Sequence, residues 1–179
     1  MAMQDSTSAV TPHALLGVGV RPSRTSGERD AGHMWMNWSR TTSPHPPYRG
    51  YYPCADQLPE YTNLREFVEF FLVNAVPGIR VVDYRAIELL ERHPDRCLDH
   101  KWDIDDPQKD RLELRCWVPP GTDSVQEGKY SLDTEHPGWH NCVSWALEVV
   151  DHVMNVTEYL PRPRPARIRT FIQAVWPTS

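Results

Sequence analysis

The chain has 179 residues, enough for one well-packed core and short for two. Its formal net charge of -5 at pH 7 provides no overall basic surface for nucleic acid or an anionic membrane. No run approaches the roughly 20 apolar residues of a membrane span. Residues 1–20 lack a basic start followed by a long apolar stretch, so we expect no classical export signal. The expected location is the cytoplasm, or a site reached by a non-classical secretion route.

Composition divides the chain into three parts. Residues 1–13 are small and polar, which predicts a disordered tail. Residues 14–160 carry the apolar patterns of a single domain. Residues 161–179 begin with alternating proline and arginine, which favours an extended C-terminal extension.

Three short segments near the N-terminus are predicted to be strands. LLGVGV (15–20) is short, apolar and interrupted by glycine. HMWMNWS (33–39) alternates with a period of two, so that His33, Trp35 and Asn37 share one face of a strand. YRGYYP (48–53) is expected to pair with this second strand. One face of the second strand therefore presents polar side chains next to an apolar face.

The middle of the chain favours alternating helices and strands. A helix is predicted from an apolar stripe at helical spacing, and Pro77 and Gly78 are expected to end it. Asp106 and Pro107 are good helix starters for a further helix. The predicted segments are helices at 63–75, 86–93 and 106–118, strands at 79–84 and 97–104, and a loop with a short strand at 121–132.

Cys142 stands at the start of the last predicted helix, 141–155. Asn141 before it is a strong N-cap candidate, because its side-chain oxygen can accept a bond from a first-turn amide. That position places the thiol at the positive end of the helix dipole, which favours a thiolate. The same first-turn amides could donate to an oxyanion during acyl transfer. A cysteine on an apolar helix face is also often a small core residue, so position alone leaves both interpretations open.

His33 is the candidate base for this thiol. A nucleophilic cysteine needs a base within hydrogen-bond reach, and a strand packed against the helix can present one. His33 follows Gly32, which would let a neighbouring backbone approach closely. An ordinary histidine at a strand edge is the alternative.

Three motifs occur in an order that resembles a known family. GHMWMNW, then GYYP, and much later NCVSWALEVV resemble the circularly permuted papain-like hydrolases of the NlpC/P60 superfamily. The resemblance implies an α+β fold with a small antiparallel sheet packed against helices and a catalytic cysteine at a helix N-terminus. It also implies that His33 and Cys142 form a catalytic pair which cleaves an amide or peptide bond through a thioester. A cell-wall amidase or an effector toxin would fit, and so would a thiol acyltransferase or deamidase.

The resemblance leaves the orienting residue open. His45 is the first candidate, because some permuted relatives carry a second histidine downstream, and Asn37, Tyr51 and Asp83 are alternatives. Trp35, Asn141 and His140 are expected in the substrate or oxyanion region.

Neither a metal nor a cofactor is expected. The four cysteines contain no CxxC pair, and we expect them to be reduced. His136 and His140 are four residues apart, but Pro137 and Gly138 between them exclude the helical spacing of a zinc protease. A catalytically inert protein-binding module remains the alternative in a different functional class. The sequence does not determine the oligomeric state.

Overall fold

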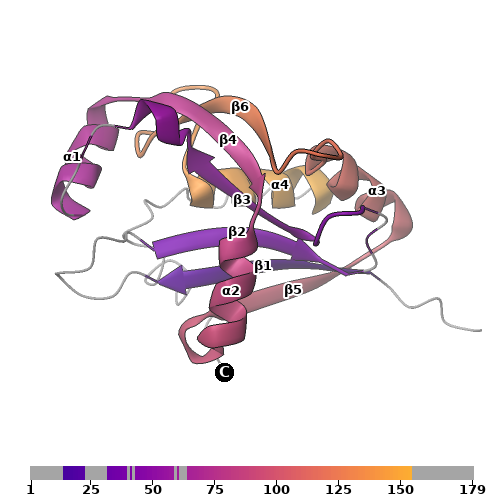
Figure 1. Cartoon of the computed structure of the whole chain (residues 1–179). Helices are drawn as coiled ribbons and strands as arrows, with labels where there is room; N and C mark the ends of the chain where they lie inside the picture. Colours follow the sequence, from indigo (N-terminus) through magenta and orange to yellow (C-terminus); the bar gives the residue numbers. More distant parts are fainter. Residues whose placement is uncertain are drawn as a thin grey trace, which may run out of the picture.

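The structure, a computed structural model, describes residues 14–22, 32–39, 41, 43–58, 60 and 64–154. The expected tail at 1–13 and the extension at 161–179 lie outside the described residues. Within the described part, helices and strands combine in a mixed α+β arrangement around one curled sheet (Figure 1). The α+β class predicted from the sequence is therefore confirmed.

Among the residues that the structure describes, seven strands form the sheet, in the order β5-β1-β2-β3-β4-β6-β7. All neighbouring pairs are antiparallel except β6 and β7, which are parallel. The sheet is thus larger than the small one expected, though mostly antiparallel as expected. The strands are β1 (Ala14–Pro22), β2 (Gly32–Trp38), β3 (Tyr48–Pro53), β4 (Val76–Val82), β5 (Leu98–Ile104), β6 (Ser124–Tyr130) and β7 (Trp139–His140).

Strand β4 begins earlier than its sequence suggests. Pro77 and Gly78 lie inside the strand, at a register shift between Pro77 and Ile79 where a missing amide is tolerated. A Cβ at position 78 would collide with the Tyr51 hydroxyl, so the close approach of β3 requires glycine there. Pro77 and Gly78, which the sequence predicts to end the preceding helix, are therefore part of strand β4.

In the described part of the chain, four α-helices surround the sheet. Asp105 caps α3 in a capping box with Gln108, one residue before the predicted starter Asp106. Asp83 caps α2 through the Ala86 amide. The helices are α1 (Leu64–Val73), α2 (Tyr84–Arg92), α3 (Asp106–Arg115) and α4 (Cys142–Met154), and two short 3-10 helices span η1 (Ala55–Gln57) and η2 (Pro94–Arg96).

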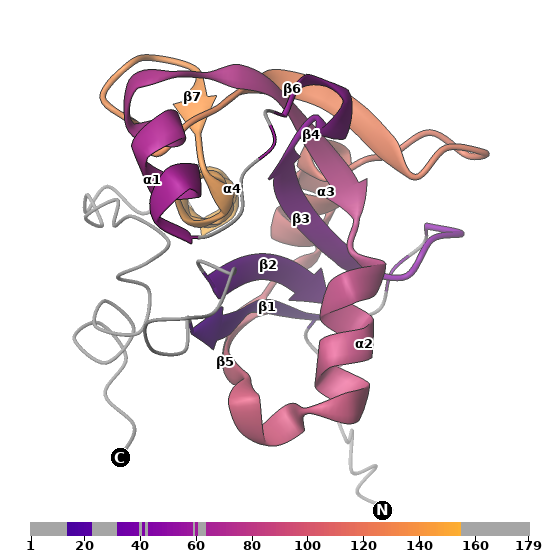
Figure 2. The same ribbon diagram turned by 60° about the vertical axis from the view of Figure 1, so that its left-hand side comes forward.

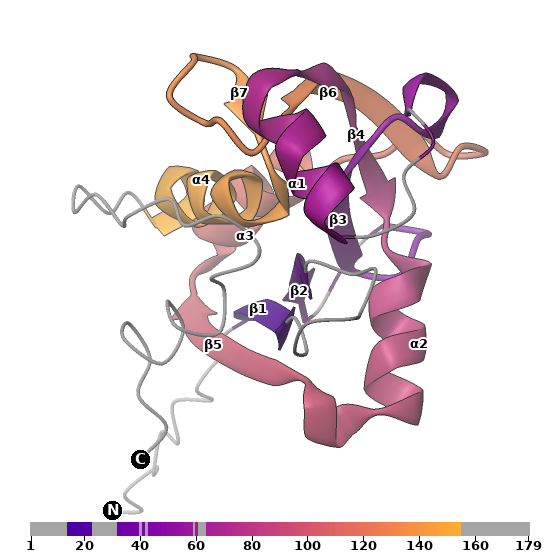
Figure 3. The same cartoon turned by 90° about the vertical axis from the view of Figure 1, so that its left-hand side faces the viewer.

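Helix α4 is the central helix of the core. Its buried face includes Trp145, whose ring stacks on that of Tyr51 with centroids 5.8 Å apart. Figure 3 shows α4 and α2 on opposite sides of β2 and β3, and the rotated view in Figure 2 agrees. This arrangement places two strands between the helix that begins at Cys142 and the helix that follows Asp83. Within the described residues, no helix has both the length and the apolar character needed to span a membrane.

Candidate thiol site

Cys142 is the first residue of α4, and its neighbours fix the helix start. Asn141 Oδ1 accepts hydrogen bonds from the amides of Val143 and Ser144, at 2.9 and 3.0 Å. In return the Asn141 amide donates to Ser144 Oγ at 2.9 Å, which completes a reciprocal cap. The predicted N-cap role of Asn141 is confirmed. These bonds do not engage the Cys142 amide, which points along the helix axis with the other first-turn donors.

His33 lies between an acid and the thiol. Its Nε2 atom is 2.7 Å from Asp83 Oδ2, and the Cys142 side chain lies close enough to the ring to raise the pKa of the imidazole. Because Nε2 faces the carboxylate, Nδ1 is the ring nitrogen that remains for the thiol. The structure therefore brings Cys142 into the surroundings of the His33 ring, although more than a hundred positions separate them in the chain.

Tyr52 completes the cluster around the imidazole. Its hydroxyl oxygen lies 2.8 Å from His33 Nε2 and donates to Asp83 Oδ1 at 3.1 Å. The two rings are 4.6 Å apart between centroids. The antiparallel register of β2 and β3, extended two residues beyond the Trp35–Gly50 pair, sets His33 opposite Tyr52, which agrees with their ring contact.

Asp83 reaches the imidazole from the junction of β4 and α2. One carboxylate oxygen caps α2 at the Ala86 amide, at 2.9 Å, and the other faces His33. A Cβ at position 50 would collide with Asp83 Oδ2 and with the Tyr52 ring. Glycine at position 50 is therefore what lets the carboxylate and the phenol reach the histidine.

Electrostatics favour a protonated imidazole paired with a carboxylate. Burial alone would lower the pKa of His33, but the Asp83 carboxylate, with a smaller contribution from Cys142, raises it to about 9. Burial alone would raise the pKa of Asp83, but the His33 charge and hydrogen bonds from Ala86 and Tyr52 hold it below its usual range. Burial and the Asp83 charge raise the pKa of Tyr52, so its hydroxyl stays protonated and able to donate.

The site is closed. Cys142 is 2% exposed and His33 is 4% exposed, while Trp35, with its ring 6.0 Å from that of His33, is fully buried. Trp35 therefore packs behind the imidazole, where the absence of a side chain at Gly19 makes room for its indole. A substrate can reach the sulfur only after the side chains that cover it move.

The structure does not bring His45 to the imidazole. Its Nε2 atom lies 3.3 Å from the carbonyl oxygen of Pro119, in a loop contact. Of the candidates for the orienting position, Asp83 makes the contact with His33 and His45 does not. Asn37 shares the face of His33 but packs over Gly17.

His140, expected at the rim of the site, is instead buried at 7% exposure. Its Nε2 atom is 3.3 Å from Glu148 Oε2, and its ring meets that of Tyr51 edge to face. It belongs to a cluster of charged and aromatic groups that joins β7 to α4. His136 pairs with Asp133 at 3.6 Å rather than with the thiol.

Two members of the cluster were not singled out by sequence reasoning. The sequence does not single out Tyr52, although its place in the GYYP strand after His33 is a signal for it. Asp83 is only one of several alternatives, because the sequence predicts it near the end of a strand. An aspartate directly before a helical segment is a typical N-cap, and that signal places its carboxylate at the β4–α2 junction.

Comparison with known protein families, with curated proteins and with solved structures finds no match for this chain. In the part of the chain that the structure describes, no group of three or more His, Cys, Asp or Glu side chains is arranged to hold a metal ion. All four cysteines are free thiols.

Proposed function

We propose that this protein is a thiol-dependent hydrolase that cleaves an amide or peptide bond, with Cys142 as nucleophile, His33 as base and Asp83 as orienting acid. One observation supports it above all: a buried imidazole is paired with a carboxylate through Nε2, and the thiol of a helix-start cysteine lies close enough to the ring to affect its pKa. A satisfied core histidine would need neither the thiol nor this order of contacts. The permuted papain-like resemblance of the sequence motifs agrees with the proposal.

In the proposed reaction, His33 already holds the proton of the thiol in an ion pair, and the Cys142 sulfur attacks the substrate carbonyl carbon. The new C–S bond moves the carbonyl electron pair onto oxygen, where the Cys142 amide at the start of α4 can donate to it. The electron pair then returns, the C–N bond breaks, and the His33 proton goes to the leaving amine. The product is a thioester on Cys142.

The second half of the reaction uses the same groups in reverse. His33, now neutral, takes a proton from water, and the resulting nucleophile attacks the thioester carbonyl. The C–S bond breaks, a carboxylic acid leaves, and the thiolate is again paired with the protonated His33. Asp83 keeps Nε2 protonated throughout, so that Nδ1 stays directed at the sulfur and the water.

An activated ester tests this proposal without knowledge of the natural substrate. With p-nitrophenyl acetate we expect a burst of about one equivalent of p-nitrophenolate and an acetyl group on Cys142, located by peptide mass spectrometry. Cys142→Ala should abolish the burst. Cys116→Ala, which removes another buried free thiol, should retain it.

Acetylation confined to other residues, or a burst that survives in Cys142→Ala, would contradict the proposal. The trapped adduct also separates the two half-reactions. Release by water alone indicates a hydrolase, whereas release that depends on an added amine indicates an acyltransferase.

A further inference from the structure

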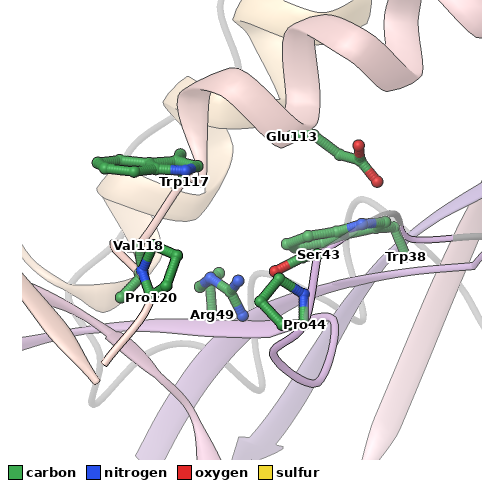
Figure 4. Close-up of a pocket in the computed structure, with 8 residues that line it drawn as sticks. All are labelled: Trp38, Ser43, Pro44, Arg49, Glu113, Trp117, Val118 and Pro120. Carbon is green, nitrogen blue, oxygen red and sulfur yellow. The ribbon is translucent and has the colours of Figure 1, made fainter. Parts of the chain in front are cut away.

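A second recessed site lies on the chain. A cavity of about 190 Å³ opens between α3, the loop that follows it and the segment before β3 (Figure 4). It is smaller than the roughly 300–1,000 Å³ of pockets for drug-sized ligands, so its ligand would be small. Cys142, His33 and Asp83 do not line it. The lining residues are Trp38, Ser43, Pro44, Arg49, Glu113, Trp117, Val118 and Pro120.

Arg49 provides the charge in this cavity. Its Nε donates to the carbonyl of Cys116 at 2.9 Å, and its Nη1 donates to the carbonyls of Pro46 and Tyr48 at 2.6 and 2.8 Å. None of these bonds uses Nη2. Figure 4 shows the guanidinium at the centre of the lining residues, between Pro44 and the pair Val118 and Pro120.

The charge on Arg49 is buried among neutral hydrogen-bond acceptors. The residue is 1% exposed, and in the part of the chain that the structure describes no ion pair joins it to a carboxylate. Neutral carbonyls accept all three of its hydrogen bonds, and burial lowers its pKa. A buried cation is expensive unless an anion compensates it. The cavity beside it is where such an anion can enter.

The other lining residues restrict what the anion can be. The Trp38 ring lies under the guanidinium at 5.1 Å, and Trp117, 54% exposed, stands at the mouth of the cavity with the prolines. These apolar walls suit a ring or short hydrocarbon group. Glu113 also lines the cavity and would repel a second negative charge.

From these contacts we infer that the Arg49 cavity binds a small monocarboxylate whose flat apolar body lies against Trp38 and Trp117 while its carboxylate meets the guanidinium. With Nε and Nη1 bonded to carbonyls, Nη2 is the donor that remains for the carboxylate, in a charge-assisted hydrogen bond. The inference does not rest on the thiol chemistry, since the two sites share no residue.

Calorimetric titration with benzoate and with benzamide, its neutral analogue of the same shape, tests the site. We expect a millimolar dissociation constant for benzoate and at least about tenfold weaker binding of benzamide, because a bond to a charged group contributes about 1.5–3 kcal/mol. Trp117→Ala should weaken benzoate about two- to tenfold, as expected for the loss of an aromatic wall. Cys142→Ala should bind benzoate as the native chain does.

Each other result overturns the inference. Equal affinities for benzoate and benzamide would show that the guanidinium does not bind the carboxylate. If benzoate does not bind at all, the cavity does not bind a monocarboxylate of this size. Loss of benzoate binding in Cys142→Ala would show that benzoate binds at the thiol site. Unchanged binding in Trp117→Ala would show that benzoate binds outside the Arg49 cavity. Arg49→Gln should lose the preference for benzoate. If Arg49→Gln does not fold, the comparison of benzoate with benzamide and the Trp117→Ala variant still test whether the cavity binds a monocarboxylate.

Discussion

Replacing His33 with alanine should slow acylation of Cys142 by p-nitrophenyl acetate by about 10²–10⁴-fold, the usual contribution of a positioned base. The imidazole is the base of the proposed mechanism, so without it the sulfur attacks with no positioned proton acceptor. The burst rate, measured per folded molecule, gives the effect. Circular dichroism supplies the folded fraction, because the substitution also leaves Asp83 buried without its cationic partner.

His45→Ala is the matched control for this variant. Its imidazole bonds to the Pro119 carbonyl and does not contact His33, so the acylation rate should stay within about twofold. A rate that is equal in the native chain and in His33→Ala would contradict the assignment of the base. A rate that falls as far in His45→Ala as in His33→Ala would show that acylation does not depend on the pair.

Replacing Asp83 with asparagine should lower the acylation rate by about a hundredfold or more. Asparagine is an equally good N-cap, so the bond to the Ala86 amide can persist and α2 should keep its start. What the variant loses is the charge that holds Nε2 protonated and directs Nδ1 at the thiol. Asp105→Asn is the control, since Asp105 caps α3 in the same way outside the cluster, and its rate should match the native chain.

Asp83→Asn should also change how the melting temperature depends on pH. The pKa of His33 is raised to about 9 in the folded chain, so the folded state holds its proton where the unfolded state, near pH 6.5, releases it. The melting temperature of the native chain should therefore fall as pH rises from about 6.5 to 9. In Asp83→Asn this fall should shrink, because the charge that raises the pKa is gone. Melting curves with the same slope in both chains would contradict the ion pair.

The sequence predicts the secondary structure well where apolar periodicity is strong. The helix at α4, the strands β1 to β3 and β5, and the Asn141 cap all appear where periodicity and capping rules place them. The sequence predicts β6 only as a short strand within a loop, because few of its positions are apolar. In the structure, pairing with β4 extends this strand to seven residues.

The candidate site is harder to read from sequence, because its members meet only in three dimensions. His33 and Cys142 carry recognisable local signals, a strand face and a helix start. Asp83 and Tyr52 do not, since their roles depend on the register that sets β2 beside β3 and on the close approach allowed at Gly50. Burial of the thiol at 2% exposure also has no signal in sequence, where a helix-start cysteine can face either a cleft or the core.

The central claim, that the imidazole activates this one thiol, is tested most directly by the rates of alkylation of the four cysteines with iodoacetamide at pH 7. Exposure alone predicts that the half-buried Cys54 and Cys97 react first. The account predicts that Cys142 reacts fastest despite its burial, at least about tenfold faster than Cys116, another buried thiol whose pKa burial raises to about 11. In His33→Ala the two buried thiols should react equally slowly. A native chain in which Cys142 reacts no faster than Cys116 would contradict the account.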